Sequence, residues 1–220
     1  PGQAVIRTPE DIARAEPYLG VPAILEEFVP FDYEASIVMV NDGERIVSFP
    51  IGQNIHRDGI LDLCIVPAPR MDDAVRARLV EQSEAFMRRC GYTGILAIEY
   101  FVKGGELYFN EMAPRPHNSG HYTIEGCTTN QFRELCRYLL GEPLQEPRLV
   151  APTVMKNILG EDLAVAAETG AEGAQSPEEG VYVHLYGKSV SKPKRKMGHI
   201  TFVGMTAGEY DARWRGRFVE

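Results

Sequence analysis

Two apolar segments of similar length lie on either side of a glycine pair near the middle of the chain. Ile95 to Phe101 and Glu106 to Met112 are rich in aliphatic and aromatic residues, and Lys103-Gly104-Gly105 lies between them. Two strand-forming segments joined by so short a glycine-containing link are typical of an antiparallel hairpin. The apolar character of both segments further predicts that the hairpin is central and largely buried.

Further turn and helix patterns flank this hairpin. Asn41-Asp42-Gly43 is a turn sequence between the strand patterns Glu34 to Val40 and Arg45 to Phe49. Asp72 to Cys90 and Thr128 to Leu140 carry apolar residues at helical spacing, and a glycine follows each of them. Four more segments have the composition of short strands, and these are Ala23 to Val29, Thr153 to Leu159, Val181 to Leu185 and Ile200 to Val203. The sequence thus predicts an α+β fold in which an antiparallel sheet carries helices.

A stretch rich in proline and glutamate, Gly141 to Pro152, marks a domain boundary. We therefore expect a first domain over residues 1–145 and a small β-rich C-terminal domain over residues 146–220.

Charge and hydropathy exclude several classes of protein. The net charge of −8 argues against general binding to nucleic acid or to an anionic membrane, because both require a dominant positive field. No apolar run approaches the roughly 20 residues that cross a bilayer, and no charged-then-apolar leader opens the chain. We expect a cytoplasmic protein.

The cysteines point away from a metal or disulfide framework. Cys64, Cys90, Cys127 and Cys136 lie far apart, and none belongs to a C-x-x-C pair. Cys90 and Cys136 fall on the apolar faces of the two expected helices, where Cys136 is accompanied by Phe132, Leu135 and Leu139. Buried free thiols in a reducing compartment are the expected state.

One local cluster of positive charge interrupts the acidic chain, and it consists of Lys188, Lys192, Lys194, Arg195 and Lys196. Such a cluster is suited to one phosphorylated small molecule, while a solvated surface loop is the alternative that charge alone leaves open.

The central hairpin carries a pair of carboxylates. If its loop is centred near Gly105, Glu99 and Glu111 oppose each other on one face, which Phe101 and Phe109 share. Two like charges on a partly apolar surface are unfavourable unless a cation lies between them, and Mg²⁺ prefers such oxygen ligands. Asn110 adds a neutral oxygen beside the pair. A solvent-exposed pair remains the alternative.

A polar segment follows the second carboxylate directly. Ala113 to His121 contains a guanidinium, two imidazoles, an amide and a hydroxyl, with too much proline and glycine for a strand or helix. Arg115 suits bidentate capture of a planar anion such as bicarbonate or phosphate, and a histidine can donate, accept or transfer a proton. An ordinary polar loop is the alternative.

These residues together resemble a known family. Glu99 with Asn110-Glu111 and the run after them resemble the ATP-grasp family. The segment Arg115-Pro116-His117-Asn118-Ser119-Gly120-His121 resembles its N5-carboxyaminoimidazole ribonucleotide synthases. That resemblance implies carboxylation of 5-aminoimidazole ribonucleotide with ATP and bicarbonate, by way of carboxyphosphate. It also implies the ATP-grasp antiparallel sheet and Mg²⁺.

The resemblance assigns roles by position. Glu99 and Glu111 would bind the metal. The nucleotide site would include Glu26, Glu27, Phe28, Val29, Glu34, His56 and Asn110. Catalysis would depend on Arg115, His117 and Asn118. The ribonucleotide substrate would contact Ser119, Lys188, Arg195 and Lys196.

The same resemblance implies a homodimer and a longer protein. Gly2-Gln3 resembles the end of a glycine-rich loop, so we expect a further N-terminal half upstream. Two alternatives remain open at this point. One is a sister ATP-grasp ligase, such as the formate-using glycinamide ribonucleotide transformylase or a biotin-dependent carboxylase. The other is a non-catalytic binding or dimerisation module.

Overall fold

The computed structural model describes residues 3–172 and 180–218, so the expectation for Gly2 lies outside the described residues. The chain forms two compact units, residues 1–31 and residues 32–220.

The first unit contains η1 (Pro9–Tyr18), a 3₁₀-helix. The Asp11 carboxylate accepts hydrogen bonds from the backbone N–H groups of Arg7 and Thr8, at 3.0 and 3.2 Å. The strand predicted at 23–29 is wrong, because this segment has no strand or helix assignment. A strand requires a neighbouring strand for its hydrogen bonds, and the described residues of this unit offer none. Its side chains are accordingly open to solvent, with Leu25 91% exposed.

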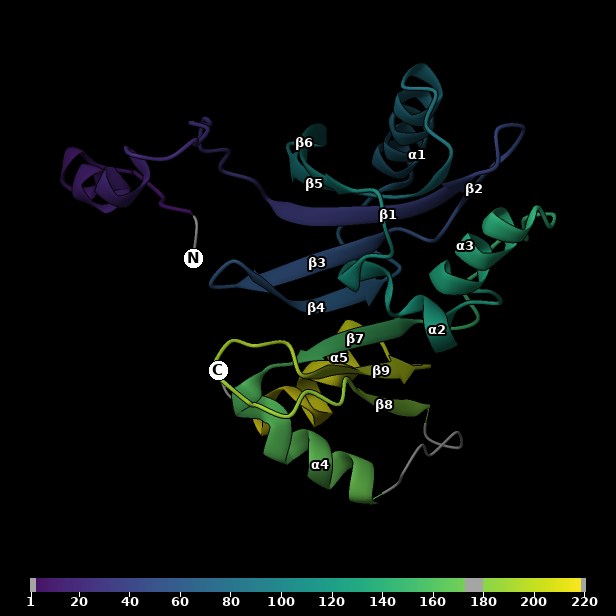
Figure 1. Cartoon of the computed structure of the whole chain (residues 1–220). Coiled ribbons are helices and arrows are strands. Elements are labelled where there is room, and N and C mark those ends of the chain that lie inside the picture. The colour runs from purple at the N-terminus through teal and green to yellow at the C-terminus, as the bar shows by residue number, and fades with distance from the viewer. Residues whose placement is uncertain (1–2, 173–179, 219–220) are drawn as a thin grey trace. The chain divides into compact units, whose positions relative to one another are not determined.

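The second unit is built on one sheet, whose nine strands among the described residues all pair antiparallel in the order β6-β5-β1-β3-β4-β7-β9-β8, with β2 on β1 (Figure 1). The strands are β1 (Tyr33–Asn41), β2 (Ile46–Ser48), β3 (Gly52–Arg57), β4 (Ile60–Val66), β5 (Gly94–Lys103), β6 (Glu106–Ala113), β7 (Thr153–Ile158), β8 (Val181–Leu185) and β9 (Gly198–Val203). The α+β class and its antiparallel sheet are confirmed.

The helices of this unit are α1 (Asp73–Arg89), η2 (Asn118–Gly120), α2 (Thr123–Gly126), α3 (Gln131–Leu140), η3 (Gly160–Asp162), α4 (Leu163–Glu172), α5 (Ala207–Arg213) and η4 (Arg215–Arg217). The Asp72 side chain caps α1 by accepting from Val75 N–H at 2.8 Å. Gly141 ends α3 in the left-handed conformation. None of the described helices combines the length and apolar character that a membrane crossing requires.

Strand alternation gives β1 two different faces. Ala35, Ile37 and Met39 pack in one hydrophobic cluster with Val75 and Leu79 of α1. Residues of the other parity, such as Val38 and Val40, pack with the segment that contains α2 and α3. Glu34 and Ser36 have this second parity. The polar end of β1 therefore lies on the face opposite α1.

The predicted hairpin between β5 and β6 is confirmed, but the expectation that it is central and largely buried is wrong for β6. This strand lies at the edge of the sheet, where only β5 among the described strands pairs with it, and most of its side chains are exposed. The register of the hairpin also contains a bulge. Gly104 and Gly105 both have positive φ, at 57° and 80°, which favours glycine in a two-residue turn. Glu99 pairs with Glu111, whereas Tyr100 pairs with Phe109. Asn110 is therefore the extra residue of β6, and the predicted placement of Phe109 beside the carboxylates is wrong. Its ring contacts Tyr100 and Phe86 of α1 instead.

Helix α3 buries polar side chains and exposes apolar ones. Gln131 and Glu134 are fully buried, while Phe132 is 40% and Leu139 is 69% exposed. Buried Gln and Glu are tolerated here because both have hydrogen-bond partners. The expectation of four buried thiols is correspondingly half wrong. Cys64 and Cys127 are buried and Cys90 and Cys136 are exposed.

The sheet continues across the boundary expected at residues 145/146. Strand β4 pairs with β7, and β7 with β9, so the C-terminal segment extends the same sheet. The two-domain division stays a prediction.

Candidate active site

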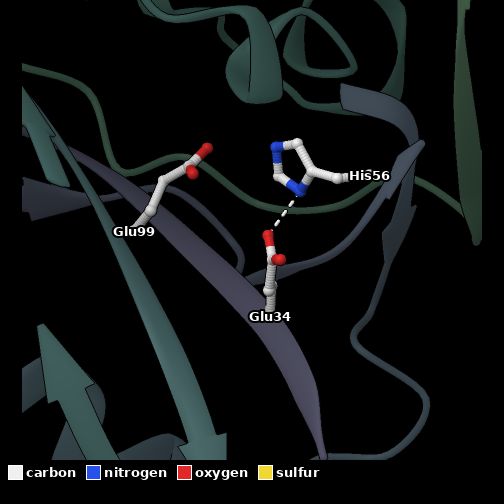
Figure 2. Close-up of side chains that lie close together, drawn as sticks. All are labelled: Glu34, His56 and Glu99. Carbon is white, nitrogen blue, oxygen red and sulfur yellow. Dashed lines mark ion pairs between the residues drawn. The ribbon is translucent and has the colours of Figure 1, made fainter. Parts of the chain in front are cut away.

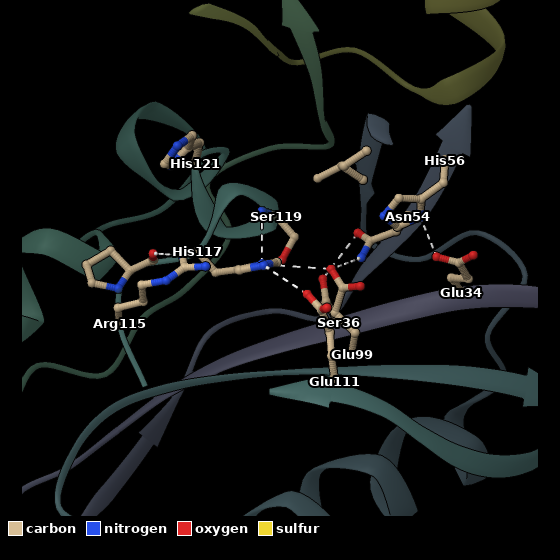
Figure 3. Close-up of polar contacts among 12 residues, drawn as sticks. Glu34, Ser36, Asn54, His56, Glu99, Glu111, Arg115, His117, Ser119 and His121 are labelled. Carbon is tan, nitrogen blue, oxygen red and sulfur yellow. Dashed lines mark hydrogen bonds and ion pairs between the residues drawn. The ribbon is translucent and has the colours of Figure 1, made fainter. Parts of the chain in front are cut away.

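The strand register places a row of polar side chains on one face of the sheet. Asn54 of β3 is opposite Glu34 of β1, and Glu99 of β5 is opposite Ser36 of β1. Glu111 of β6 is in turn opposite Glu99, as predicted. Four neighbouring strands thus each contribute to one polar patch (Figure 3).

The buried part of this patch is a short hydrogen-bond chain. Ser36 Oγ donates to Asn54 Oδ1 at 3.2 Å, and Asn54 Nδ2 donates to Glu99 Oε1 at 3.2 Å. All three residues are buried. Burial raises the pKa of Glu99 to about 7, with His56 opposing and Glu111 reinforcing the shift. Near neutral pH Glu99 is therefore poised to bind either a proton or a cation.

A second group of ligating atoms adjoins Glu99. His56 Nδ1 forms a close ion-pair contact with a carboxylate oxygen of Glu34, and the Glu99 carboxylate lies beside this pair (Figure 2). Burial lowers the pKa of His56, but the Glu34 carboxylate outweighs it, so the pKa is raised overall. These residues form a compact acidic and imidazole cluster.

The segment after β6 brings His117 over the two carboxylates. Its Nδ1 accepts from the backbone N–H of Ser119 at 3.4 Å and lies 2.9 Å from Ser119 Oγ. Because a backbone N–H can only donate, Nδ1 is the acceptor and Nε2 carries the proton of the neutral ring. Nε2 lies 3.6 Å from Glu111 Oε1, and Nδ1 lies 3.8 Å from Glu99 Oε1.

The His117 imidazole is uncharged at neutral pH. Burial lowers its pKa to about 4, and the nearby cations Arg115 and Lys196 act in the same direction. Its approach to the two carboxylates is therefore not an ion pair. A neutral donor at Nε2 is suited to binding an anion that enters beside Glu111.

Other residues of this segment differ in exposure. Arg115 is exposed at the edge of the patch, and its Nη1 donates to the carbonyl of Pro116 at 3.2 Å. Asn118 is half-buried, and its Nδ2 has no hydrogen-bond partner among the described residues. Ser119 is fully buried, so its hydroxyl acts on His117 rather than reaching solvent.

Of the basic cluster, Lys196 lies near enough to the polar patch to interact electrostatically with its carboxylates. Burial lowers the pKa of Lys196, and the nearby carboxylates of Glu99 and Glu111 partly offset this. Lys188 Nζ donates to the carbonyl of Lys196, and Arg195 Nη1 donates to the carbonyl of Val190 at 2.8 Å. Both of those side chains are otherwise exposed.

The remaining predicted residues lie at the margins or in the first unit. Asn110 is half-buried at the β6 bulge. Residues 26–29 belong to the first unit and have no helix or strand assignment, and the centroid of the Phe28 ring lies 4.9 Å from the Arg7 guanidinium carbon. Their contact with a nucleotide stays a prediction.

The donor set suits a divalent cation. Glu99, Glu111 and His117 bring atoms of ligating type within 4.8 Å of one another, but His117 would have to give up its Nδ1 hydrogen bond or its Nε2 proton to bind a metal. Glu34, His56 and Glu99 form a second group of the same compactness. Carboxylate oxygens are the ligands that Mg²⁺ prefers, so the pair Glu99 and Glu111 fits this ion.

Comparison with known families agrees with this geometry. The sequence model of the ATP-grasp domain matches residues 1–132. The chain belongs to the ATP-grasp family. A second model, the phosphoribosylaminoimidazole carboxylase C-terminal domain, matches residues 153–213 of this ATP-grasp chain.

Individual relatives carry related names. The N5-carboxyaminoimidazole ribonucleotide synthase of Bacillus subtilis is 37% identical over 215 residues, which are 95% of this chain and 54% of that protein. The phosphoribosylaminoimidazole carboxylase of Saccharomyces cerevisiae is 34% identical, over 96% of this chain and 38% of that protein. The ATP-grasp chain thus spans about half or less of these relatives.

Solved structures agree in fold. An ADP complex of an N5-carboxyaminoimidazole ribonucleotide synthetase has a TM-score of 0.88 at 36% identity, covering 96% of this chain and 55% of that one. The Aspergillus clavatus synthase in complex with ADP and 5-aminoimidazole ribonucleotide has a TM-score of 0.75 at 30% identity, covering 86% and 52%.

Sequence reasoning missed three buried members of the site. Ser36 and Asn54 link the strands to Glu99, and Gln131 of α3 binds the backbone of His117. These three residues carry no local signal in the sequence, because their roles depend on tertiary neighbours.

Proposed function

We propose that the protein carrying this chain carboxylates 5-aminoimidazole ribonucleotide to N5-carboxyaminoimidazole ribonucleotide, using ATP and bicarbonate. The observation that carries this proposal is the position of His117, whose ring lies over the opposed pair Glu99 and Glu111. An anion-binding segment next to a metal-binding pair is what phosphorylation of bicarbonate requires. The names of the relatives support the choice of substrate.

Glu99 and Glu111 would hold Mg²⁺, with Asn110 supplying a neutral oxygen nearby. When bound, the ion neutralises charge on the phosphoryl group that ATP transfers to bicarbonate. Ser36 and Asn54 keep the buried carboxylate of Glu99 in position through their hydrogen bonds. In the absence of a cation, the same carboxylate retains a proton more readily than an exposed one.

The segment after β6 would bind bicarbonate and the carboxyphosphate formed from it. Among the residues that the structure describes, the Arg115 guanidinium forms no ion pair with a carboxylate, so it could bind an anion. The Asn118 side chain offers an amide N–H without a hydrogen-bond partner among the same residues. His117 donates from Nε2, because Ser119 holds its Nδ1 as an acceptor. Ser119, predicted to bind substrate, would thus contribute through His117. Hydrolysis of carboxyphosphate must be prevented, so water must be excluded when the site is filled.

The nucleotide would lie along the edge of the site formed by β1 and β3. Glu34 would accept from the ribose hydroxyls, and His56, held by Glu34, would face the nucleotide. The backbone of residues 26–29 would contact the adenine. Lys188, Arg195 and Lys196 would bind the phosphate of the ribonucleotide, where positive charge is needed.

Several broader expectations are part of the same proposal. Residues 1–145 and 146–220 would act as two domains of the whole protein, which would be a cytoplasmic homodimer. Its partners would be small molecules, and it would bind neither nucleic acid nor membranes, in keeping with the net charge of −8.

The experiment is an assay of ADP release from magnesium ATP and bicarbonate, with and without 5-aminoimidazole ribonucleotide. It is run on this chain and on the protein with any sequence that naturally precedes residue 1. Stimulation by the ribonucleotide in the longer protein supports the proposal. Stimulation by a different amine or acid would keep the ATP-grasp chemistry and overturn the substrate.

A further inference from the structure

Gln131 is a fully buried polar residue that belongs to none of the predicted sites. It is the first residue of α3, and it follows the cap Asn130, whose side chain accepts from Phe132 and Arg133 N–H. A buried side-chain amide is costly unless its donors and acceptor are all paired. The partners of this amide therefore show what it holds in place.

The Gln131 amide binds both backbone polar groups of a single residue. His117 N–H donates to Gln131 Oε1 at 2.9 Å, and Gln131 Nε2 donates to the His117 carbonyl at 2.9 Å. The second proton on Nε2 points to His121 Nδ1, at 3.0 Å. All hydrogen-bonding groups of the amide except one lone pair are thus used. The opposite orientation of the amide is excluded, because it would place an NH₂ group against the N–H of His117.

The surroundings keep this amide in place. Thr123 Oγ1 accepts from Gln131 N–H at 3.2 Å and donates to the Gly120 carbonyl at 2.6 Å. A Cβ atom on Gly120 would lie 2.5 Å from Gln131 Oε1 and 3.0 Å from a methyl of Val38. The chain therefore passes Gln131 at a distance that only glycine permits. This contact and the hydrogen bonds join α3 to the segment that carries His117.

We propose that Gln131 is a positioning residue, which holds the backbone of His117 so that its imidazole stays over Glu99 and Glu111 and can bind bicarbonate. The pairing resembles a neighbouring strand, since one amide supplies both an acceptor and a donor to one residue. Helix α3 is a rigid element, so it transmits a fixed position to a segment that contains two prolines and no strand pairing of its own. The structural part of this proposal, that Gln131 holds the backbone of His117, depends on geometry alone. The part concerning bicarbonate rests on the proposed function.

Amide hydrogen exchange tests the structural part on the chain itself. Gln131→Met keeps the volume of the side chain and removes both hydrogen bonds to His117. We expect exchange at His117 N–H to accelerate at least tenfold, while strands β1 and β5 exchange as before. The matched control is Glu134→Gln on the same helix. Glu134 is also fully buried, but it accepts from Thr129 Oγ1 and Gln145 N–H. In this variant the remaining amide oxygen can still accept from Gln145 N–H and the NH₂ group can donate to Thr129 Oγ1, so exchange at His117 should stay unchanged.

A second variant covers the case in which Gln131→Met fails to fold. In Gln131→Glu one oxygen still accepts from His117 N–H, while the other faces the His117 carbonyl and the lone pair of His121 Nδ1. His121 should respond by carrying its proton on Nδ1 instead of Nε2, a change that imidazole ¹⁵N chemical shifts report. Unchanged His117 exchange in the methionine variant, or an unchanged His121 tautomer in the glutamate variant, would overturn the inference.

Kinetics of the longer protein test the part that concerns bicarbonate. Gln131→Met should raise the KM for bicarbonate at least tenfold and leave the KM for ATP within twofold, and Glu134→Gln should change neither. Equal effects of the two variants on bicarbonate would refute the role of Gln131. If ADP release by the wild-type protein does not depend on the ribonucleotide, the proposed function is refuted instead. The hydrogen-exchange experiment would still decide whether Gln131 holds His117.

Discussion

Glu99 and Glu111 oppose each other across β5 and β6, yet the side chain of Glu99 is 6% exposed and that of Glu111 is 61% exposed. The pair is therefore asymmetric. Ionised Glu99 is unfavourable without a cation, because burial raises its pKa to about 7, whereas Glu111 is solvated. Substitutions at the two positions should consequently differ in their effects on stability and on metal binding.

Glu99→Gln should stabilise the metal-free protein at neutral pH. The pKa of Glu99 rises from 4.5 to about 7 on folding, so its contribution to stability is complete below pH 4.5 and is lost as the pH rises through 7. Glutamine mimics the protonated form. The free energy of unfolding of the variant should match wild type near pH 4.5 and exceed it by about 3 kcal/mol above pH 7. Denaturant unfolding in the presence of a chelator measures the free energy of unfolding of wild type and variant at each pH.

The comparison with wild type is needed because other groups titrate in the opposite sense. His117 and His121 have pKa values lowered to about 4, so their contributions to stability grow as the pH rises from 4 toward 6.5. A difference between Glu99→Gln and wild type that does not change between pH 4.5 and 8 would contradict the account of Glu99.

Glu111→Gln should weaken metal binding without unfolding the protein. The substitution removes one of two anionic oxygen donors, and we expect the affinity for Mg²⁺ or Mn²⁺ to fall at least about tenfold. Because the side chain is largely solvated, stability should stay within about 0.5 kcal/mol. Glu106→Gln, on the same strand and 72% exposed, makes the same change of charge away from the site. Calorimetric titration with equal affinities for both variants would argue against a metal at Glu111.

Arg115→Ala should abolish ADP release that depends on bicarbonate and leave nucleotide binding largely intact. The guanidinium is exposed, and its only described hydrogen bond goes to the neighbouring Pro116 carbonyl, so little stability depends on it. Arg89→Ala, an exposed arginine in the last turn of α1, is the control for loss of one positive charge. Normal turnover of the Arg115 variant in the longer protein would refute its role in binding bicarbonate.

Gly120→Ala should destabilise the protein by about 1–3 kcal/mol, since the added methyl group overlaps the Gln131 side chain and Val38. Gly208→Ala in α5 is the matched control, because a Cβ there meets nothing within 4 Å. That substitution should leave stability unchanged or raise it by up to about 1 kcal/mol. Equal melting temperatures of the two variants would contradict the close approach at Gly120.

The existence of the hairpin could be predicted from its glycine pair, and a loop centred at Gly105 gave the right pairing of Glu99 with Glu111. The two-residue turn by itself would pair Glu99 with Asn110, and the bulge brings Glu111 opposite Glu99 instead. The bulge at Asn110 could not be predicted, since it depends on how the strand fits its neighbours after the turn. The bulge also explains the error at Phe109. One extra residue in β6 places its side chain on the face of the sheet that carries α1, opposite the face of the carboxylates. Family-like segments supplied the remaining roles, which local patterns alone did not indicate.

Buried polar residues account for most of what sequence reasoning missed. Gln131 and Glu134 follow no hydrophobic pattern, and α3 buries them because distant backbone groups satisfy them. Lys156 is similar, since its ammonium lies 2.6 Å from an Asp62 oxygen in the interior. Strand β3 went unpredicted because its polar sequence becomes a strand only between β1 and β4. The partners of Gln131 and Lys156, and one of the two neighbours of β3, lie beyond the reach of a local sequence pattern.

Transfer of oxygen from bicarbonate to phosphate tests the central claim most directly. The longer protein is supplied with magnesium ATP, 5-aminoimidazole ribonucleotide and ¹⁸O-labelled bicarbonate, and the released phosphate is analysed by mass spectrometry. If bicarbonate is phosphorylated at this site, one labelled oxygen appears in each phosphate, and Arg115→Ala abolishes the labelled product. Phosphate that is released in step with carboxylation but carries no label would contradict the account.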